Sequence, residues 1–352
     1  MTMLDNKLFA DYESNHIIMT YPSMHAELEY YKKIKHVYIN LSKILSHNKI
    51  LQSFIVPKDF KESKSFLHEL NQHVNIIKYD CDDIWIRDYY PKIYLKNGSK
   101  YKLDFDYNAY GEKYPFRKDD YFKYTLNQYN TEFDLSGFVL EGGNLEFSKR
   151  GVAISNSRCL KKNNYKCSAQ DVLDKLLFIK NKLSFNELHM IEVGNIQGDD
   201  TNGHIDNLVR FIDDENIVYF ASNDKQYINF DIAKELEHQL LIIKRKSKII
   251  KNIFPIFHNE ADTFIYNNNY YPYSKLNFVI TSNCIIFPSI KKNQSYLSNW
   301  VEKIASSKKK YIINCEGILI ANGGLHCFCA NILIWLYYSI SLFQIKVRIL
   351  NT

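Results

Sequence analysis

Apolar and polar residues alternate along this chain in two patterns, one typical of strands and one typical of helices. Short apolar or alternating runs between turn-forming residues predict strands, and apolar residues at helical spacing predict amphipathic helices. Strands are predicted at residues 16–22, 49–56, 74–79, 89–95, 100–107, 138–147, 151–155, 188–193, 217–221, 277–281, 284–287 and 311–320. Helices are predicted at residues 24–35, 59–73, 121–129, 169–183, 231–247 and 296–307. The strand–helix–strand order comes round about five times without a Pro-, Gly- or Ser-rich linker, which favours one α/β domain over residues 1–352.

The stretch from Gly198 to Phe211 brings a histidine and a carboxylate together. Alternation from Ile205 onward predicts a strand with one buried face. Residues two apart on a strand share a face, so His204 and Asp206 are expected to lie about 7 Å apart on a rigid element. A structural histidine beside a solvated aspartate is an equally simple interpretation of this stretch alone, and a His-x-Asp ligand pair for a metal is another.

Composition narrows the class of protein. Of the 352 residues, 46% are apolar, which is normal for a globular protein. The net charge is +6, and the lysines occur in short scattered runs, as on solvated helix ends, so nucleic-acid binding is not expected. Seven cysteines without a CxxC pair disfavour a disulfide framework and a zinc knuckle. They favour a reducing compartment, and the first 15 residues show no secretory signal, so a cytoplasmic protein is expected.

An apolar tail follows residue 327. Residues 328–345 contain no charged side chain, and this length reaches the lower limit for a membrane-spanning helix. A buried terminal helix, a divergent end and a membrane anchor are the three interpretations. Polar residues dilute the run and basic residues appear only after it, so we favour a packed or poorly ordered end over membrane contact.

Four clusters place ionisable groups beside glycines or at strand ends. They are Asp88 after Trp85, Glu141 before a Gly pair, His204 with Asp206, and Cys327 after a second Gly pair. Each alone has a structural explanation, such as a turn cap for the aspartate or burial for the cysteine.

Together the four clusters describe one kind of chemistry. A thiol and an imidazole are the equipment of covalent catalysis, if the fold joins them. Three carboxylates nearby suit a cationic substrate, and a guanidinium offers five N–H donors that two carboxylates can hold from opposite edges. A metal site is less favoured, because no second histidine lies at ligand spacing near His204.

The chain resembles the agmatine deiminase and bacterial peptidylarginine deiminase-like branch of the guanidine-modifying (pentein) superfamily. The segments that carry the resemblance are residues 85–88, 104–114, 141–144, 198–211, 271–278 and 323–327. They run in family order and extend over about residues 16 to 329. Residues 330–352 form a divergent apolar tail, Asn202 stands where many relatives carry Asp, and Tyr110 where many carry Trp.

The resemblance implies an α/β fold of five strand–helix modules, a propeller with pseudo-fivefold symmetry and a central active site. It also implies roles for the clustered residues. Cys327 would be the nucleophile and His204 the general acid and base. Asp88 and Asp206 would clamp the guanidinium, Glu141 would orient His204 or line the site, and Trp85 would help to shape the pocket.

The implied activity is hydrolysis of agmatine to N-carbamoylputrescine and ammonia through a covalent Cys-thiouronium, without a cofactor or metal. Deimination of arginine side chains in peptides is the alternative within the same chemistry, ahead of a free-arginine hydrolase or an amidinotransferase. A non-catalytic guanidinium-binding protein is the alternative from another class, although binding alone needs no thiol. A small cationic guanidinium compound is the expected partner, and a homodimer is left open.

Overall fold

The computed structural model describes residues 7–22, 29–60, 74–183, 185–293 and 307–333, and five units of one topology account for most of it. In each unit an antiparallel strand pairs with the first strand of a parallel pair. Parallel neighbours need a crossover connection, which a helix usually supplies. In the first unit, β2 (His16–Thr20), β3 (Leu51–Val56) and β4 (Asn75–Lys78) run parallel, and β19 (Ala330–Ile332) pairs antiparallel with β2.

The other four units follow in chain order. The second is β5 (Lys92–Lys96), β6 (Ser99–Asp106) and β7 (Asn130–Val139), with β1 (Lys7–Leu8) beside β5. The third is β8 (Glu146–Phe147), β9 (Val152–Asn156) and β10 (Glu187–Ile191). The fourth is β11 (Val209–Phe211), β12 (Asn216–Ala221) and β13 (Asn252–Phe257). The fifth is β16 (Val279–Ile280), β17 (Cys284–Ser289) and β18 (Lys309–Asn314), and β14 (Phe264–Tyr266) and β15 (Asn269–Tyr271) form a separate hairpin.

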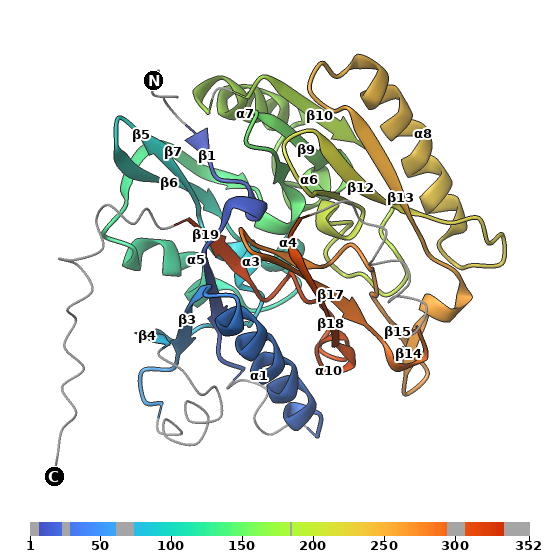
Figure 1. Ribbon diagram of the computed structural model, residues 1–352. Helices are drawn as coiled ribbons and strands as arrows, with labels where there is room; N and C mark the ends of the chain where they lie inside the picture. The colour runs from blue at the N-terminus through green and yellow to red at the C-terminus, as the bar shows by residue number, and fades with distance from the viewer. Residues whose placement is uncertain (1–6, 23–28, 61–73, 184, 294–306, 334–352) are drawn as a thin grey trace, which may run out of the picture.

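Helices connect the parallel strands, and the longer ones lie toward the outside (Figure 1). They are α1 (Tyr31–His47), α5 (Arg117–Phe122) with the 3-10 turn Lys123–Thr125, α6 (Ser157–Asn163), α7 (Ala169–Lys182) and α8 (Phe230–Lys246). Nearer the centre of Figure 1 lie two short helices, α3 (Ile86–Tyr89) and α4 (Ala109–Glu112). A further short helix is α10 (Glu316–Leu319), and short 3-10 turns occur at Asp11–Glu13, Gly142–Asn144, Ile205–Asn207, Glu260–Asp262 and Lys291–Asn293.

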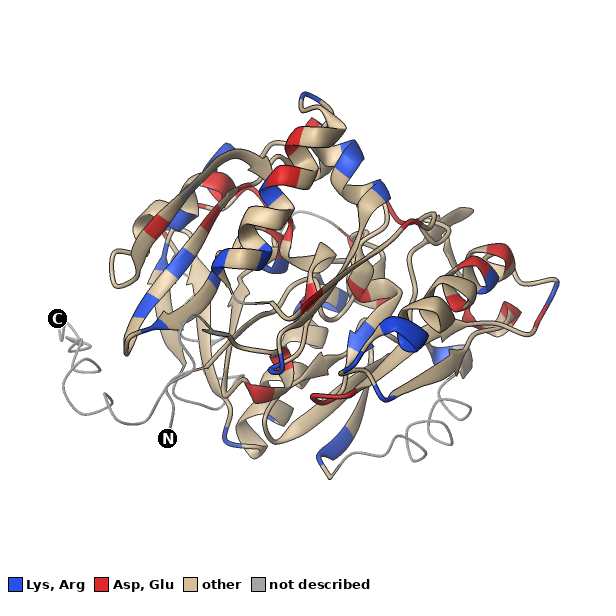
Figure 2. Cartoon of the chain, turned by 90° about the horizontal axis from the view of Figure 1, so that it is seen from above, with Lys and Arg blue, Asp and Glu red and all other residues tan. Residues whose placement is uncertain are grey.

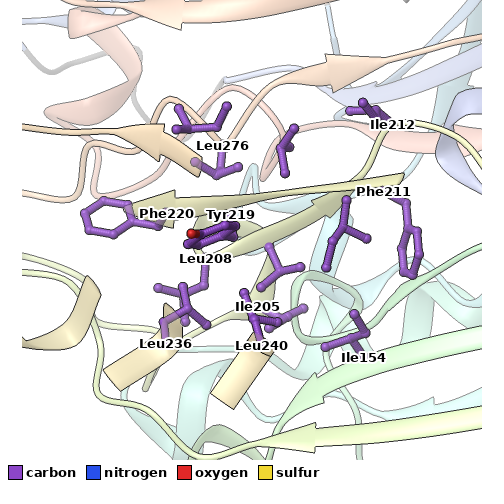
Figure 3. Packing of buried hydrophobic residues seen from close by; sticks show 14 of the residues in the cluster. Ile154, Ile205, Leu208, Phe211, Ile212, Tyr219, Phe220, Leu236, Leu240 and Leu276 are labelled. Atoms are coloured by element: carbon purple, nitrogen blue, oxygen red, sulfur yellow. The ribbon is translucent and has the colours of Figure 1, made fainter. Parts of the chain in front are cut away.

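The largest buried cluster includes the buried face of α8, in the fourth unit, and Ile205, which follows His204. The buried residues of α8 recur at helical spacing, as Ala233, Leu236, Leu240 and Ile243. Figure 3 shows Leu236 and Leu240 in one packed cluster with Ile205. The apolar face of α8 therefore helps to fix the backbone that follows His204.

Charged residues of both signs are scattered over several elements (Figure 2). Blue and red positions both occur on helices and on strands, so this view shows charges of both signs intermixed along the chain. In the part of the chain that the structure describes, no helix is long and apolar enough to cross a membrane.

Most predicted elements are present, with several differences. The helix α1 runs from Tyr31 to His47, so it shares residues 31–35 with the helix predicted at 24–35, of which residues 24–28 lie outside the described part of the chain. The helix predicted at 121–129 is displaced to 117–122, with a 3-10 turn behind it. The strand predicted at 311–320 ends at Asn314, where α10 begins two residues later. The sequence did not predict α3, α4, α6, β1, β13 or the hairpin of β14 and β15, and the strand predicted at 138–147 is interrupted by the 3-10 turn Gly142–Asn144. The predicted helices at 59–73 and 296–307 and the tail at 330–352 lie wholly or mostly outside the described residues.

Candidate active site

The segment around His204 is a turn, so the predicted strand at this point is wrong. Ile205–Asn207 forms a 3-10 turn, and strand pairing begins only at Val209. Side chains of the preceding loop hold the backbone: the Gly203 N–H donates to Asp199 Oδ2 (3.0 Å) and the His204 N–H to Thr201 Oγ1 (3.1 Å). Such local bonds compete with a strand ladder. As a result His204 and Asp206 take different partners, although both are buried.

Glu141 holds the imidazole of His204. Glu141 Oε2 lies 2.7 Å from His204 Nε2. The carboxylate is itself fixed, because it accepts hydrogen bonds from the Tyr110 N–H (3.0 Å) and Asn163 Nδ2 (2.5 Å). His204 Nδ1 is buried without a hydrogen-bond partner, 3.6 Å from Asp88 Oδ1. The ring is thus oriented at one nitrogen and available for a reacting group at the other.

Asp88 stands in the short helix α3, behind Trp85. Its Oδ1 accepts from the Gly143 N–H (2.8 Å) and its Oδ2 from the Tyr110 hydroxyl (3.0 Å). A Cβ on Gly143 would stand 2.5 Å from His204 Nδ1 and 2.7 Å from Asp88 Oδ1. Only glycine therefore allows this backbone to approach both side chains.

Asp206 reaches the same region from the other side. Its Oδ2 lies 2.7 Å from His326 Nδ1, and its Oδ1 is buried without a hydrogen-bond partner. A buried acceptor with no partner costs free energy, and a cationic N–H donor would remove that cost. The unpartnered carboxylate oxygen on Asp206 suits a guanidinium, which offers several N–H groups.

Cys327 lies between α10 and β19, and 5% of its surface is exposed. Asn277 Nδ2 donates to its Sγ at 3.3 Å. A Cβ on Gly324 would collide with the Asn277 amide oxygen, and a Cβ on Gly323 would collide with the Trp85 indole. The second Gly pair therefore lets Asn277 and Trp85 approach the loop that carries the thiol.

The charges in this region act strongly on one another. Burial raises the pKa of the Cys327 thiol well above its ordinary value, and Asp206 and Asp88 raise it further. Burial also raises the pKa of Asp88, to about 7, against the opposing effect of His204. Burial lowers the pKa of His204, but Asp88, with Cys159 and Glu141, outweighs it, so the pKa is raised well above the ordinary value. The empty site thus combines a neutral thiol with a protonated imidazole at neutral pH.

The structure brings the six predicted site residues together in one buried region, and it adds residues that the sequence reading did not single out. Asn277 contacts the thiol, His326 contacts Asp206, and Cys159 lies beside His204. Asn277 falls in one of the matching segments, and His326 directly precedes Cys327, so the sequence could have indicated both as site residues. No feature of the sequence pointed to Cys159.

Among the described residues, two groups of side chains are close enough to hold a metal ion: Glu141 with Cys159 and His204, and Asp11 with Glu146 and His326. In each group the ligand atoms are already engaged with protein partners. Glu141 and His204 contact each other at 2.7 Å, as do Asp11 and His326, and Glu146 Oε1 lies 2.6 Å from Arg210 Nε. The carboxylates and at least one nitrogen of each imidazole thus already have protein partners, and we assign no metal to either group.

Comparison with known proteins identifies the family. Residues 10–332 match the model of the Porphyromonas-type peptidyl-arginine deiminases. The chain belongs to this family. Among curated relatives, a Mycoplasma capricolum protein provisionally named agmatine deiminase is 25% identical over 321 residues, which cover 84% of this chain and 86% of that protein. A Streptococcus mutans protein with the same provisional name is 24% identical over 323 residues, with the same coverage.

Solved structures of related proteins share the fold. An agmatine deiminase of C. jejuni, solved with substrate bound in a Cys-to-Ser variant, is 25% identical with a TM-score of 0.79, over 93% of this chain and 96% of that one. A provisionally assigned peptidyl-arginine deiminase is 23% identical with a TM-score of 0.84 and supports the fold alone. The predicted α/β fold of five repeated modules is confirmed.

Proposed function

We propose that this member of the family hydrolyses agmatine to N-carbamoylputrescine and ammonia. The observation that carries the proposal is the convergence of a buried thiol, Cys327, and an oriented imidazole, His204, with the carboxylates Asp88 and Asp206. Carboxylates on opposite edges would orient the guanidinium as well as neutralise it, and both effects contribute strongly to catalysis.

In the first half of the reaction, Asp88 and Asp206 hold the guanidinium nitrogens. Once the cation is bound, the Cys327 thiol releases its proton to solvent, and the thiolate attacks the guanidino carbon. His204, which is protonated in the empty site, gives its proton to the departing nitrogen. Ammonia leaves, and an S-alkylthiouronium remains on Cys327.

In the second half, neutral His204 takes a proton from a water molecule that attacks the same carbon. The C–S bond then breaks, the carbamoyl product leaves, and the cysteine is regenerated. Glu141 keeps the imidazole in one orientation through both steps, because its own two oxygens are held by Tyr110, Asn163 and His204.

Acidic residues near Asp88 favour agmatine over arginine. Burial, together with the charges of Asp200 and Asp88, raises the pKa of Asp83 to about 7, which places the three carboxylates within electrostatic reach of one another. The ammonium tail of agmatine would be attracted to such a region, and the carboxylate of free arginine would be repelled. The substrate-bound C. jejuni agmatine deiminase was obtained with a Cys-to-Ser variant, as expected if a cysteine consumes the substrate.

Ammonia release from three guanidines tests the proposal. We expect kcat/KM for agmatine to exceed that for free arginine and for a blocked arginine peptide by about 10-fold or more, which corresponds to about 1.4 kcal/mol of discrimination. Faster release from the blocked peptide would reject agmatine in favour of the runner-up, peptidylarginine deimination. The absence of turnover with all three would favour a binding protein.

The thiol of the free enzyme should be neutral at pH 7. Burial and two carboxylates raise its pKa, so the reactive thiolate forms only as the pH rises above the ~8.5 of an ordinary cysteine. Iodoacetamide alkylation of Cys327, followed by mass spectrometry over a pH series, should therefore give an apparent pKa above that value. An apparent pKa below about 7 would show a resting thiolate and remove the role of the substrate in creating its own nucleophile.

We also propose that residues 1–352 act as one catalytic domain that needs no cofactor. The described cysteines are free thiols, which supports a reducing compartment such as the cytoplasm.

A further inference from the structure

His326 connects a substrate-binding carboxylate to a residue near the start of the described chain. Its Nδ1 lies 2.7 Å from Asp206 Oδ2 and its Nε2 lies 2.7 Å from Asp11 Oδ2. Only 1% of the His326 side chain is exposed. Neither contact has a part in the chemistry described above, although His326 stands next to the nucleophile in sequence.

The carboxylate of Asp11 contacts three cationic or polar side chains. Besides His326, its carboxylate contacts Arg87 Nη1 at 3.2 Å and Arg210 Nη2 at 3.1 Å. Arg87 directly precedes Asp88, and Arg210 follows Asp206 by four residues. The Asp11 carboxylate therefore holds side chains that lie near Asp88, Asp206 and Cys327 in the sequence.

The same network supports the thiol through the backbone. The His326 N–H donates to the Asn277 amide oxygen at 2.7 Å, and Asn277 Nδ2 donates to the thiol of Cys327. Arg210 Nη1 donates to the carbonyls of Leu276 and Phe278, on both sides of Asn277, at 3.2 and 2.7 Å.

The contacts of His326 indicate the protonation state of its imidazole ring. Burial, with the guanidiniums of Arg210 and Arg87, lowers its pKa to about 4, against the effect of the two carboxylates, which favour the charged ring. We take the doubly donating form, because a nitrogen and a carboxylate oxygen 2.7 Å apart repel each other without a proton between them.

In that form His326 occupies one oxygen of Asp206 and leaves the other, Oδ1, unpartnered. The pKa of Asp206 is lowered, because the hydrogen bond and charge of His326 outweigh the effect of burial. The carboxylate is thus kept ionised and in one rotamer, with its free oxygen presented to a ligand.

We propose that His326 is a positioning residue for guanidinium binding, which holds Asp206 through Nδ1 and is anchored to Asp11 through Nε2. This inference rests on the proposed function, since it assigns Asp206 to the guanidinium. It adds a role for the residue before the nucleophile and for a residue of the N-terminal segment.

A matched pair of substitutions separates the two contacts. The amide nitrogen of Asn takes the place of Nδ1 and can still donate to Asp206, whereas that of Gln takes the place of Nε2 and reaches toward Asp11. Both variants keep a polar side chain, and thermal unfolding checks that both fold. Agmatine binding is measured by calorimetry in full-length Cys327→Ser protein, which cannot turn the ligand over.

We expect His326→Gln to weaken agmatine binding by about 10- to 100-fold, as for loss of a hydrogen bond to a charged group, and His326→Asn to keep most of the affinity. In the enzyme with Cys327 intact, KM should rise more than kcat falls. Equal affinity in the two variants, whether both are weak or both are unchanged, would overturn the proposal.

Failure of the proposed function would look different. If the Cys327→Ser parent binds a blocked arginine peptide and not agmatine, then agmatine is the wrong substrate. The same Asn and Gln comparison is then made with the peptide, because its guanidinium makes the same demand on Asp206. The contrast between the two variants still decides the role of His326.

Discussion

A Cys327→Ser substitution should leave agmatine binding largely intact and lower the rate of ammonia release by on the order of 10⁴-fold or more. The hydroxyl is nearly the same size as the thiol, so Asp88 and Asp206 should still hold the guanidinium. A serine hydroxyl is far less acidic than a thiol, and no neighbouring base in its resting form would deprotonate it, since His204 is held protonated. Single-turnover ammonia release and calorimetric binding measure the two effects separately.

Cys329→Ser is the matched control. Cys329 is fully buried, and its pKa is raised chiefly by burial. It stands two residues from Cys327, but no contact places its thiol against Asn277, Asp88 or Asp206 among the described side chains. The control should retain turnover, after thermal unfolding confirms the fold. Equal loss in both variants would mean that the nucleophile is misassigned or that both thiols are needed.

Gly143→Ala should lower kcat/KM for agmatine by on the order of 10²-fold or more, because displacement of catalytic groups by about 1 Å has effects of that size. The added methyl would stand 2.5 Å from His204 Nδ1 and 2.7 Å from Asp88 Oδ1, and neither side chain can retreat, since Glu141 and Tyr110 hold them. The damage should fall on His204 orientation and guanidinium binding together.

Gly194→Ala provides the control for a small-to-larger change at a glycine. A Cβ there would meet its nearest neighbour, Arg158, at 3.5 Å, which is ordinary contact. This variant should keep the parent kcat/KM. Steady-state assays of both variants, with thermal unfolding, separate a local clash from general destabilisation. Full activity in Gly143→Ala would contradict the close packing described for the site.

The regular elements could be predicted because their periodicity survives in the final packing. The helices predicted at 169–183 and 231–247 match α7 and α8 closely, since each buries one stripe. The segment at 205–208 could not be predicted, because side chains of Asp199 and Thr201 hold the backbone in a turn although the residues alternate. Residues 311–320 are mostly apolar, but Gly317 passes the backbone of α1 so closely that the short helix α10 replaces the end of the strand.

The site residues likewise divide into those that the sequence predicted and those that it did not. Asp88, Glu141, His204 and Cys327 were found because each stands beside a glycine or at a strand end, where chemistry is commonly exposed to a ligand. The importance of His326 could not be derived in this way. Its two partners lie 120 and 315 residues away in sequence, so only the folded topology reveals that one imidazole links them.

The pairing of β19 with β2 has a consequence for how the enzyme becomes active. Cys327 precedes β19, and β2 belongs to the earliest module, so the nucleophile is brought to the other groups by a contact between distant parts of the chain. Asn331 and Asp11, which hydrogen-bond beside this pairing, are 320 residues apart. Contacts of such separation are slow to form, because closure of a long loop must precede their stabilising effect. During synthesis, the first module therefore stays without β19 until the end of the chain is made, and the protein acquires its reactivity only when β19 closes the ring.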